Sequence, residues 1–341
     1  MRAIVIPRYG GPAVLRAEER PTPQPGPGEL LIAVNAAGVN FADVLARMGL
    51  YPDAPKPPLV VGYEVAGVVD AIGSGVSGFR VGDRVFALTR FGGYATHVVT
   101  PAGFVYRTPD TLDDVQAAAI PVTYLTAIIA LYRMANLEPG ETVLVHGAGG
   151  GVGLAATQLA RLRGATVIGT ASAAKHDAIR AAGVTHAVDY RTADVASEIR
   201  RLTDGRGVDV VLDSIGGSSY AQSYRMLAPL GRLVIYGVSS IAPGEKRSLL
   251  QAVRTVLTMP NFKPLSLMNR NRGVFGLNMG HLWGERDKLA AAMDVVMREV
   301  VNGQLTPIIA KTFSLEEVAD AHRYMQARSN IGKIVLTASH R

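Results

Sequence analysis

The arrangement of apolar and polar positions changes once along the chain. Before residue 121, short apolar stretches such as 30–39, 64–73 and 82–88 are separated by Gly, Pro and Asp, a pattern typical of β-strands joined by turns. From Thr142 onward, β-branched apolar runs alternate with segments of helical spacing. This alternation predicts a parallel sheet with helices on both faces, because each helix must cross over the sheet to reach the next strand.

The predicted elements of the second region follow from these runs. Strands are expected at 142–147, 165–171, 186–190, 207–216, 231–238 and 274–278, with helices at 153–164 and 173–183. Toward the C-terminus the pattern predicts a helix at 285–302, a helix that follows the capping pair Ser314 and Glu317, and a strand at 332–338. The proline-rich residues 21–29 predict a surface loop.

A basic segment, residues 241–272, interrupts the alternation of strands and helices. Its apolar residues are scattered, and we predict a helix and a loop that cover the edge of the sheet. Two alternatives stay open: a mobile cover over a substrate site, and a patch that faces a membrane.

Composition limits the class of protein. The chain has 341 residues, 48% hydrophobic and 18% charged, which predicts a globular protein of two domains. The net charge is +7, but the basic residues are dispersed and no basic run is interleaved with aromatics, so we expect no nucleic-acid partner. There is no cysteine, which excludes thiol catalysis and cysteine-bound zinc. No signal segment or long apolar run is seen, so we expect a cytoplasmic protein.

The strongest chemical signal is a glycine-rich turn at residues 147–153. Five of these seven residues are glycine, and they lie between an apolar strand and an amphipathic helix. Glycines allow the backbone to approach a pyrophosphate closely, and the helix start offers free N–H groups. We therefore predict a dinucleotide site whose backbone contacts come from Gly149, Gly150, Gly151 and Val152.

The end of the following strand predicts which dinucleotide is bound. Sites specific for NAD usually have an acidic residue there, which binds the ribose hydroxyls. This chain has Ser172 and then Lys175, which offer a hydroxyl donor and a positive charge to a 2′-phosphate. Tyr190, after the third strand of this region, is within reach of the same phosphate. The sequence thus predicts NADPH as the cofactor.

Several motifs, taken in order, resemble the medium-chain dehydrogenase/reductase superfamily over essentially the whole chain. They are NFAD at 40–43, VGYEVAGVV at 61–69, VGDRV at 81–85, GGYATH at 92–97, AAAIPVTYLTA at 117–127 and GKIVL at 332–336. Metal-dependent members have a cysteine near position 40 and a histidine in a GHE motif. This chain has Asn40 and Tyr63 instead, and only Glu64 matches, so no metal site is expected.

Within the superfamily, residues 39–55 are similar to quinone oxidoreductases. Residues 169–192, 207–237 and 271–285 resemble the vesicle amine transport protein branch. The resemblance implies a GroES-like β-rich domain, residues 1–121 with 278–341, and a doubly wound Rossmann domain, residues 122–277. It further implies a homodimer, and it allows peripheral membrane contact.

The same resemblance implies roles for individual residues. Catalytic candidates are Tyr51, which would polarise a carbonyl or deliver a proton, together with Asn40 and Tyr63. Further cofactor contacts are expected from Asn40, Thr123, Gly237, Phe275, Gly276, Leu277 and Asn330. The implied reaction is zinc-independent hydride transfer from NADPH to a small-molecule electron acceptor, a quinone or an activated alkene. An enoyl-thioester or 2-alkenal reductase and a membrane-associated NADPH-binding protein with weak catalysis are the alternatives.

Overall fold

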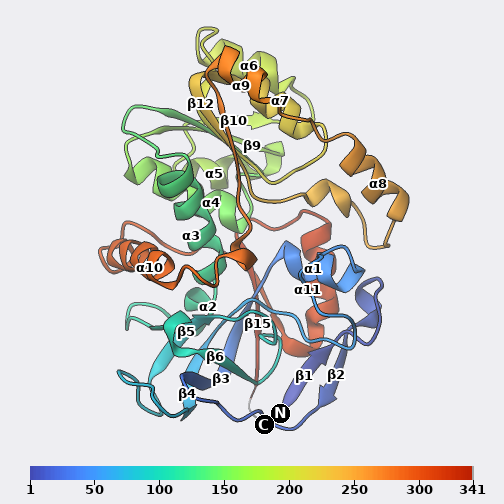
Figure 1. Ribbon diagram of the computed structural model, residues 1–341, viewed down its shortest axis with the longest axis vertical. Helices are drawn as coiled ribbons and strands as arrows, with labels where there is room; N and C mark the ends of the chain where they lie inside the picture. Colours follow the sequence, from blue (N-terminus) through green and yellow to red (C-terminus); the bar gives the residue numbers. More distant parts are fainter. Residues whose placement is uncertain (340–341) are drawn as a thin grey trace.

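The computed structural model describes residues 1–339. An α/β body and a β-rich body lie one above the other, and the chain passes between them more than once (Figure 1). The eleven helices of the described residues are α1 (Phe41–Met48), α2 (Asp114–Ala117), α3 (Pro121–Ile128), α4 (Gly151–Leu162), α5 (His176–Ala181), α6 (Val195–Leu202), α7 (Ser219–Arg225), α8 (Leu249–Leu257), α9 (Pro264–Arg270), α10 (Arg286–Val301) and α11 (Val318–Gln326).

The α/β body is built on a six-stranded parallel sheet. Its strand order is β10-β9-β8-β11-β12-β13, which in chain order is the 3-2-1-4-5-6 arrangement of a dinucleotide-binding fold. The strands are β8 (Thr142–His146), β9 (Thr166–Ala171), β10 (His186–Asp189), β11 (Val208–Asp213), β12 (Leu227–Ile235) and β13 (Gly273–Gly276). The predicted doubly wound sheet is confirmed.

Both faces of this sheet are covered because its strands are apolar on both sides. Along β8, Val143 and Val145 belong to a core shared with α3, α4 and α10, whereas Leu144 belongs to a second core shared with α6 and α7. Successive side chains of a strand point to opposite faces, so one continuous apolar run supplies two cores.

The β-rich body contains a seven-stranded sheet, in which β14-β15-β3-β4-β5-β7 are neighbours and β6 pairs with β3, and a small β1–β2 ribbon. Its strands are β1 (Arg2–Val5), β2 (Arg16–Glu19), β3 (Glu29–Val39), β4 (Glu64–Ile72), β5 (Arg84–Leu88), β6 (His97–Pro101), β7 (Val105–Arg107), β14 (Ile309–Ser314) and β15 (Lys333–Thr337). The other strands of this sheet come from the N-terminal third of the chain. Residues near the C-terminus, in β14 and β15, therefore complete the N-terminal body.

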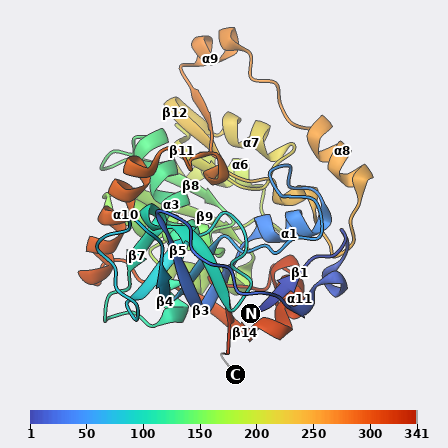
Figure 2. The ribbon, with the colours of Figure 1, turned by 60° about the horizontal axis from the view of Figure 1, so that its bottom comes forward.

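The segment 241–272 differs from the prediction of one helix and a loop. It contains two helices, α8 and α9, which lie at the periphery of the α/β body (Figures 1 and 2). The Ser248 hydroxyl accepts a hydrogen bond from the Gln251 N–H and caps α8, and Pro264 occupies the first turn of α9, where its missing N–H costs nothing. Among residues 1–339, no helix is long and apolar enough to cross a membrane.

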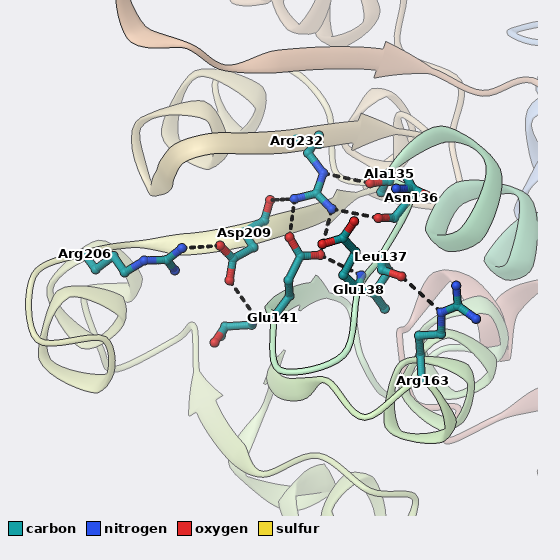
Figure 3. Close-up of polar contacts among 10 residues, drawn as sticks. Ala135, Asn136, Leu137, Glu138, Glu141, Arg163, Arg206, Asp209 and Arg232 are labelled. Atoms are coloured by element: carbon teal, nitrogen blue, oxygen red, sulfur yellow. Dashed lines mark hydrogen bonds and ion pairs between the residues drawn. The ribbon is translucent and has the colours of Figure 1, made fainter.

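A polar cluster holds the loop that leads into β8 against β12 (Figure 3). The Arg232 guanidinium on β12 donates to both carboxylate oxygens of Glu141, at 2.6 and 2.7 Å, and to the carbonyl oxygens of Ala135 and Asn136, at 2.7 and 3.2 Å. The loop between α3 and β8 is therefore tied to β12 by one side chain.

Candidate functional site

The glycine-rich turn joins β8 to α4 and is held close to both. A Cβ at position 153 would lie 2.5 Å from the Gly147 carbonyl oxygen, and one at position 151 would lie 3.0 Å from the Thr123 Cγ2. Gly147 has a φ of 64°, in the left-handed region that favours glycine. Because α4 begins at Gly151, its first N–H groups have no partner within the helix and can bind an anion.

Positive charges gather beside this turn. The Lys175 Cδ would lie 2.9 Å from a Cβ on Gly149, and its Nζ donates to the Asn330 carbonyl oxygen at 2.6 Å. Burial lowers the pKa of Lys175, and the neighbouring charges of Arg191 and Arg328 lower this pKa further. Lys175 at the turn thus lies in the field of two further cations, an environment that a bound anion would stabilise.

Two predicted residues border this cation cluster. Ser172, almost fully buried, follows the last residue of β9, and the Tyr190 ring lies 6.0 Å from the Arg191 guanidinium carbon. Sequence reasoning found Lys175, Ser172 and Tyr190 but missed both arginines. Arg191 is the residue after Tyr190 and could have been found, whereas nothing in the local sequence brings Arg328 to this position.

The two bodies meet at the same turn. The Gly332 N–H donates to the Gly149 carbonyl oxygen at 2.9 Å, and Lys333 lies beside Gly151, 3.5 Å from a Cβ built there. Asn330, a predicted cofactor contact, thus lies at the edge of the turn with its carbonyl bonded to Lys175. The C-terminal segment before β15 closes one side of the site.

Glu64, the residue that matches the zinc-binding pattern, has other partners. Its carboxylate forms a buried ion pair with Lys333 and accepts hydrogen bonds from the Asn40 amide, at 2.8 Å, and from the Val122 N–H at the start of α3, at 2.7 Å. The Lys333 Nζ also donates to the Asn40 Oδ1 at 2.6 Å. Both polar atoms of the Asn40 amide are therefore hydrogen-bonded, its nitrogen to Glu64 and its oxygen to Lys333. Lys333 is a residue of the site that was not predicted from the sequence.

Asp43 holds the residues around Asn40 in place. Its buried carboxylate accepts hydrogen bonds from the Asn40 N–H, the Gly62 N–H and the Tyr94 hydroxyl, at 2.7 to 2.9 Å. Burial raises the pKa of Asp43 to about 7, although these hydrogen bonds act in the opposite direction. Asp43 therefore fixes the backbone at Asn40 and at Gly62, the residue before Tyr63, which fits a positioning role.

An aromatic group lies next to these polar residues. The Tyr63 ring lies 6.0 Å from the Tyr51 ring and 5.3 Å from the Phe91 ring. The Tyr51 hydroxyl donates to Asn278 at 3.5 Å, but the buried Tyr63 hydroxyl has no partner within residues 1–339. Burial raises the pKa of Tyr51 to about 12 and that of Tyr63 further, so both phenols keep their proton at neutral pH and can donate a hydrogen bond.

The remaining predicted residues lie in β13 or shortly after β12 and β13. The Gly237 carbonyl accepts from the Tyr220 hydroxyl at 2.6 Å, and a Cβ at Gly237 would lie 3.2 Å from Ser214. Phe275 and Gly276 are exposed, while the Leu277 side chain is buried in the core, so only the Leu277 backbone is available to a ligand. Within residues 1–339, no hydrogen bond or ring contact joins Phe275, Gly276 or Leu277 to Tyr51 or Tyr63.

Within the described residues, no three His, Asp or Glu side chains come together as a metal ion would require. The candidate site thus consists of a phosphate-binding turn, a cation cluster and an aromatic group with a free hydroxyl. A Rossmann sheet with such a turn, joined to a GroES-like β-rich body, defines a two-domain oxidoreductase that uses a dinucleotide.

Comparison with known proteins agrees with this class. Residues 26–110 match the family described as alcohol dehydrogenase GroES-like domain, and residues 182–336 match the family described as zinc-binding dehydrogenase. The chain belongs to the medium-chain dehydrogenase/reductase superfamily. It is 41% identical over 339 residues to the human synaptic vesicle membrane protein VAT-1 homolog, covering 98% of this chain and 86% of that protein.

Two solved structures extend the comparison. Escherichia coli quinone oxidoreductase complexed with NADPH has a TM-score of 0.88 and 29% identity, covering 99% of this chain and all of that one. The CurK enoyl reductase has a TM-score of 0.86 and 30% identity, covering 99% of each chain. The predicted superfamily and fold class are confirmed.

Proposed function

We propose that the protein is a zinc-independent reductase that uses NADPH to reduce a quinone or the activated alkene of an enone. One observation carries the proposal. Lys175 lies beside the phosphate-binding turn, the charges of Arg191 and Arg328 act on Lys175, and no carboxylate follows directly on β9. Such a cluster favours a cofactor with a 2′-phosphate over one with free ribose hydroxyls.

The aromatic group supports the nature of the acceptor. When bound, NADPH supplies a hydride from C4 of its nicotinamide, and the acceptor then needs a proton and a donor to its oxygen. The Tyr63 hydroxyl is a protonated donor without a partner, and Tyr51 and Phe91 add flat apolar surface around it. A conjugated carbonyl compound combines a planar apolar skeleton with an acceptor oxygen, and so matches both features.

The cofactor proposal is tested by changing the cation cluster. We expect Lys175→Met to raise the KM for NADPH at least about tenfold while the KM for NADH changes little, because only NADPH has the phosphate that loses its partner. Arg180→Met is the matched control, since Arg180 is exposed and pairs with Asp177 on the surface. Equal losses for both cofactors in Lys175→Met would contradict the assignment.

An enoyl-thioester reductase is the nearest alternative, favoured by the similarity to the CurK enoyl reductase. Steady-state oxidation of NADPH with a quinone, an enone and an enoyl thioester separates the two. We expect the quinone or enone to give the highest kcat/KM. A thioester preferred by more than about tenfold would replace the proposed substrate class while leaving the cofactor unchanged.

A second candidate function, membrane association, is favoured by α8 and α9. Their exposed apolar residues include Leu250, Leu257 and Leu265, each more than 70% exposed, and basic residues, among them Arg254 and Arg270, lie on the same helices. Exposed apolar side chains next to cations are typical of surfaces that bind anionic lipid.

Sedimentation with vesicles tests this second function. We expect the protein to sediment with vesicles that contain anionic lipid and not with neutral ones, and Leu250→Ser with Leu257→Ser to remain in the supernatant. Leu230→Ser is the control, since Leu230 is 76% exposed but lies on β12. Unchanged sedimentation of the double variant would exclude these helices as the contact.

We also propose a homodimer. β13 is one of the two edge strands of the parallel sheet in the described chain, and an edge strand offers unpaired backbone groups to a second copy. Light scattering after size-exclusion chromatography tests this directly, and a mass of about 36 kDa, that of one chain, would contradict it.

A further inference from the structure

A line of buried polar groups runs beneath the phosphate-binding turn, across β9, β8 and β11 to α7. The Gly147 N–H donates to the Thr170 Oγ1 at 3.3 Å, and this oxygen lies 3.1 Å from the His146 Nδ1. On the other side, the His146 Nε2 lies 3.1 Å from the Ser223 Oγ, which donates to the Asp213 Oδ2 at 2.7 Å. All four side chains are at least nine-tenths buried.

Proton counting gives every bond in this line a direction. A carboxylate only accepts hydrogen bonds, so the single hydroxyl proton of Ser223 goes to Asp213. The Ser223 oxygen must then accept from His146, which requires the proton on Nε2. A neutral imidazole with its proton on Nε2 has an acceptor at Nδ1, and the Thr170 hydroxyl donates to it.

The same proton assignment explains the hydrogen bond between the Gly147 N–H and Thr170. With its proton given to His146, the Thr170 oxygen is an acceptor for the Gly147 N–H. Burial lowers the pKa of His146, against the effect of Asp213, which raises it; a neutral ring is thus favoured in this apolar interior. A protonated ring would donate from both nitrogens, and the Thr170 proton would lose its acceptor.

We propose that Asp213, Ser223, His146 and Thr170 form a positioning relay that fixes the phosphate-binding turn through Gly147, with His146 neutral and protonated on Nε2. The relay links the ends of three neighbouring strands to the first residue of the turn. Gly147 has a left-handed φ, and its N–H points into the relay, so the later N–H groups at the start of α4 are the ones presented to a pyrophosphate. This inference rests on the proposed binding of a dinucleotide at the turn.

The chain contains a matched control for the relay. The Ser219 hydroxyl also donates to the Asp213 Oδ2 at 2.7 Å, but within the described contacts it has no bond to His146. Ser219→Ala therefore removes one donor from the same carboxylate oxygen and leaves the path from Gly147 to Asp213 intact. Ser223→Ala breaks that path, and Thr170→Val breaks it while keeping the side-chain volume.

Nitrogen NMR of the full chain labelled at histidine tests the tautomer without any cofactor. His146→Gln identifies the resonances of His146 among the seven histidines. We expect a proton on Nε2 and none on Nδ1 in the natural sequence and in Ser219→Ala, and a changed pattern in Ser223→Ala. A proton on Nδ1 in the natural sequence would overturn the relay.

Calorimetric titration with NADPH tests the role of the relay. We expect Ser223→Ala and Thr170→Val to raise the Kd about three- to tenfold, as the loss of one hydrogen bond predicts. Thr170→Ser, which keeps the hydroxyl, and Ser219→Ala should remain within about twofold. The kcat at saturating NADPH should change little, since these groups do not touch the acceptor.

The NMR and calorimetric measurements can distinguish failure of the relay from failure of the proposed function. An unchanged Kd in Ser223→Ala, with tight binding by the natural sequence, would refute the positioning role alone. Failure of the natural sequence to bind NADPH would refute the proposed function, and the NMR measurement would still decide the hydrogen-bond directions.

Discussion

Tyr63 shows at the residue scale how a group that weakens the fold can serve the site. A buried hydroxyl without a partner destabilises the folded state, because it has lost its hydrogen bonds to water. Tyr63 and Tyr106 both have such a hydroxyl within the described residues, but only Tyr63 lies beside the other aromatic rings of the candidate site.

We predict that Tyr63→Phe raises the free energy of unfolding by up to about 1 kcal/mol and lowers kcat/KM about 10- to 100-fold. Urea denaturation and steady-state kinetics measure the two effects. Tyr106→Phe is the control, with a similar gain in stability and full activity. Full activity in Tyr63→Phe would exclude the proposed hydroxyl contact.

Asp43 leads to a prediction about pH. Burial raises its pKa from 3.8 to about 7 in the folded protein, so between these values the folded state keeps a proton that the unfolded chain has released. The folded state then becomes less stable as the pH rises, by about 1.4 kcal/mol for each pH unit.

The variant Asp43→Asn lacks this ionisation. We therefore expect the stability of the natural sequence, relative to Asp43→Asn, to fall as the pH rises from about 4 to about 7 and to level off above that. Urea denaturation of both proteins across this range measures the difference. A constant difference between the two would show that Asp43 does not titrate in this window.

At the scale of elements, the Arg232 cluster shows how one side chain fixes a connection. Arg232 bonds both oxygens of Glu141 and two backbone carbonyls of the loop between α3 and β8 (Figure 3). A lysine has the charge but not the planar fork of donors, and it cannot satisfy all four acceptors in this geometry.

We predict that Arg232→Lys lowers the free energy of unfolding by about 2 kcal/mol and leaves the Kd for NADPH unchanged, because the cluster is separate from the phosphate-binding turn. Arg180→Lys is the comparison, since Arg180 and its partner Asp177 are both exposed and exposed pairs contribute little. Equal losses in the two variants would contradict the importance of the forked geometry.

At the scale of the whole molecule, Lys333 joins the two bodies. It belongs to β15 of the β-rich sheet, pairs with Glu64 on β4, and lies beside Gly151 at the start of α4. Removing one member of a buried ion pair leaves the other charged and unpaired, whereas replacing both with neutral groups removes that cost.

We predict a loss of about 3 kcal/mol in the free energy of unfolding for Lys333→Met, and recovery of most of it in Lys333→Met with Glu64→Gln. A double-mutant cycle in urea measures the coupling. Reductase activity should fall in both variants, because Asn40 loses its partner in each. Additive stability losses would show that the pair is not coupled.

The features that could be predicted from the sequence are the local ones. The glycine-rich turn, the alternation of strands and helices and the sequence Ser172 to Lys175 are each contained in a few consecutive residues, and local backbone geometry explains them. One local prediction was wrong: residues 241–272 contain two helices, since Pro264 begins a second helix rather than extending a loop.

Which distant residues meet could not be predicted from the sequence, because it depends on how the segments pack. Asn40 and Lys333 are 293 positions apart in the chain, and neither local spacing nor composition brings them together. The same holds for Arg328 beside Lys175, and for the line from Gly147 to Asp213, which crosses three strands whose order depends on the sheet. Burial and charge at these places arise from packing between segments that are distant in the sequence, so they are fixed only when the sheets and helices assemble.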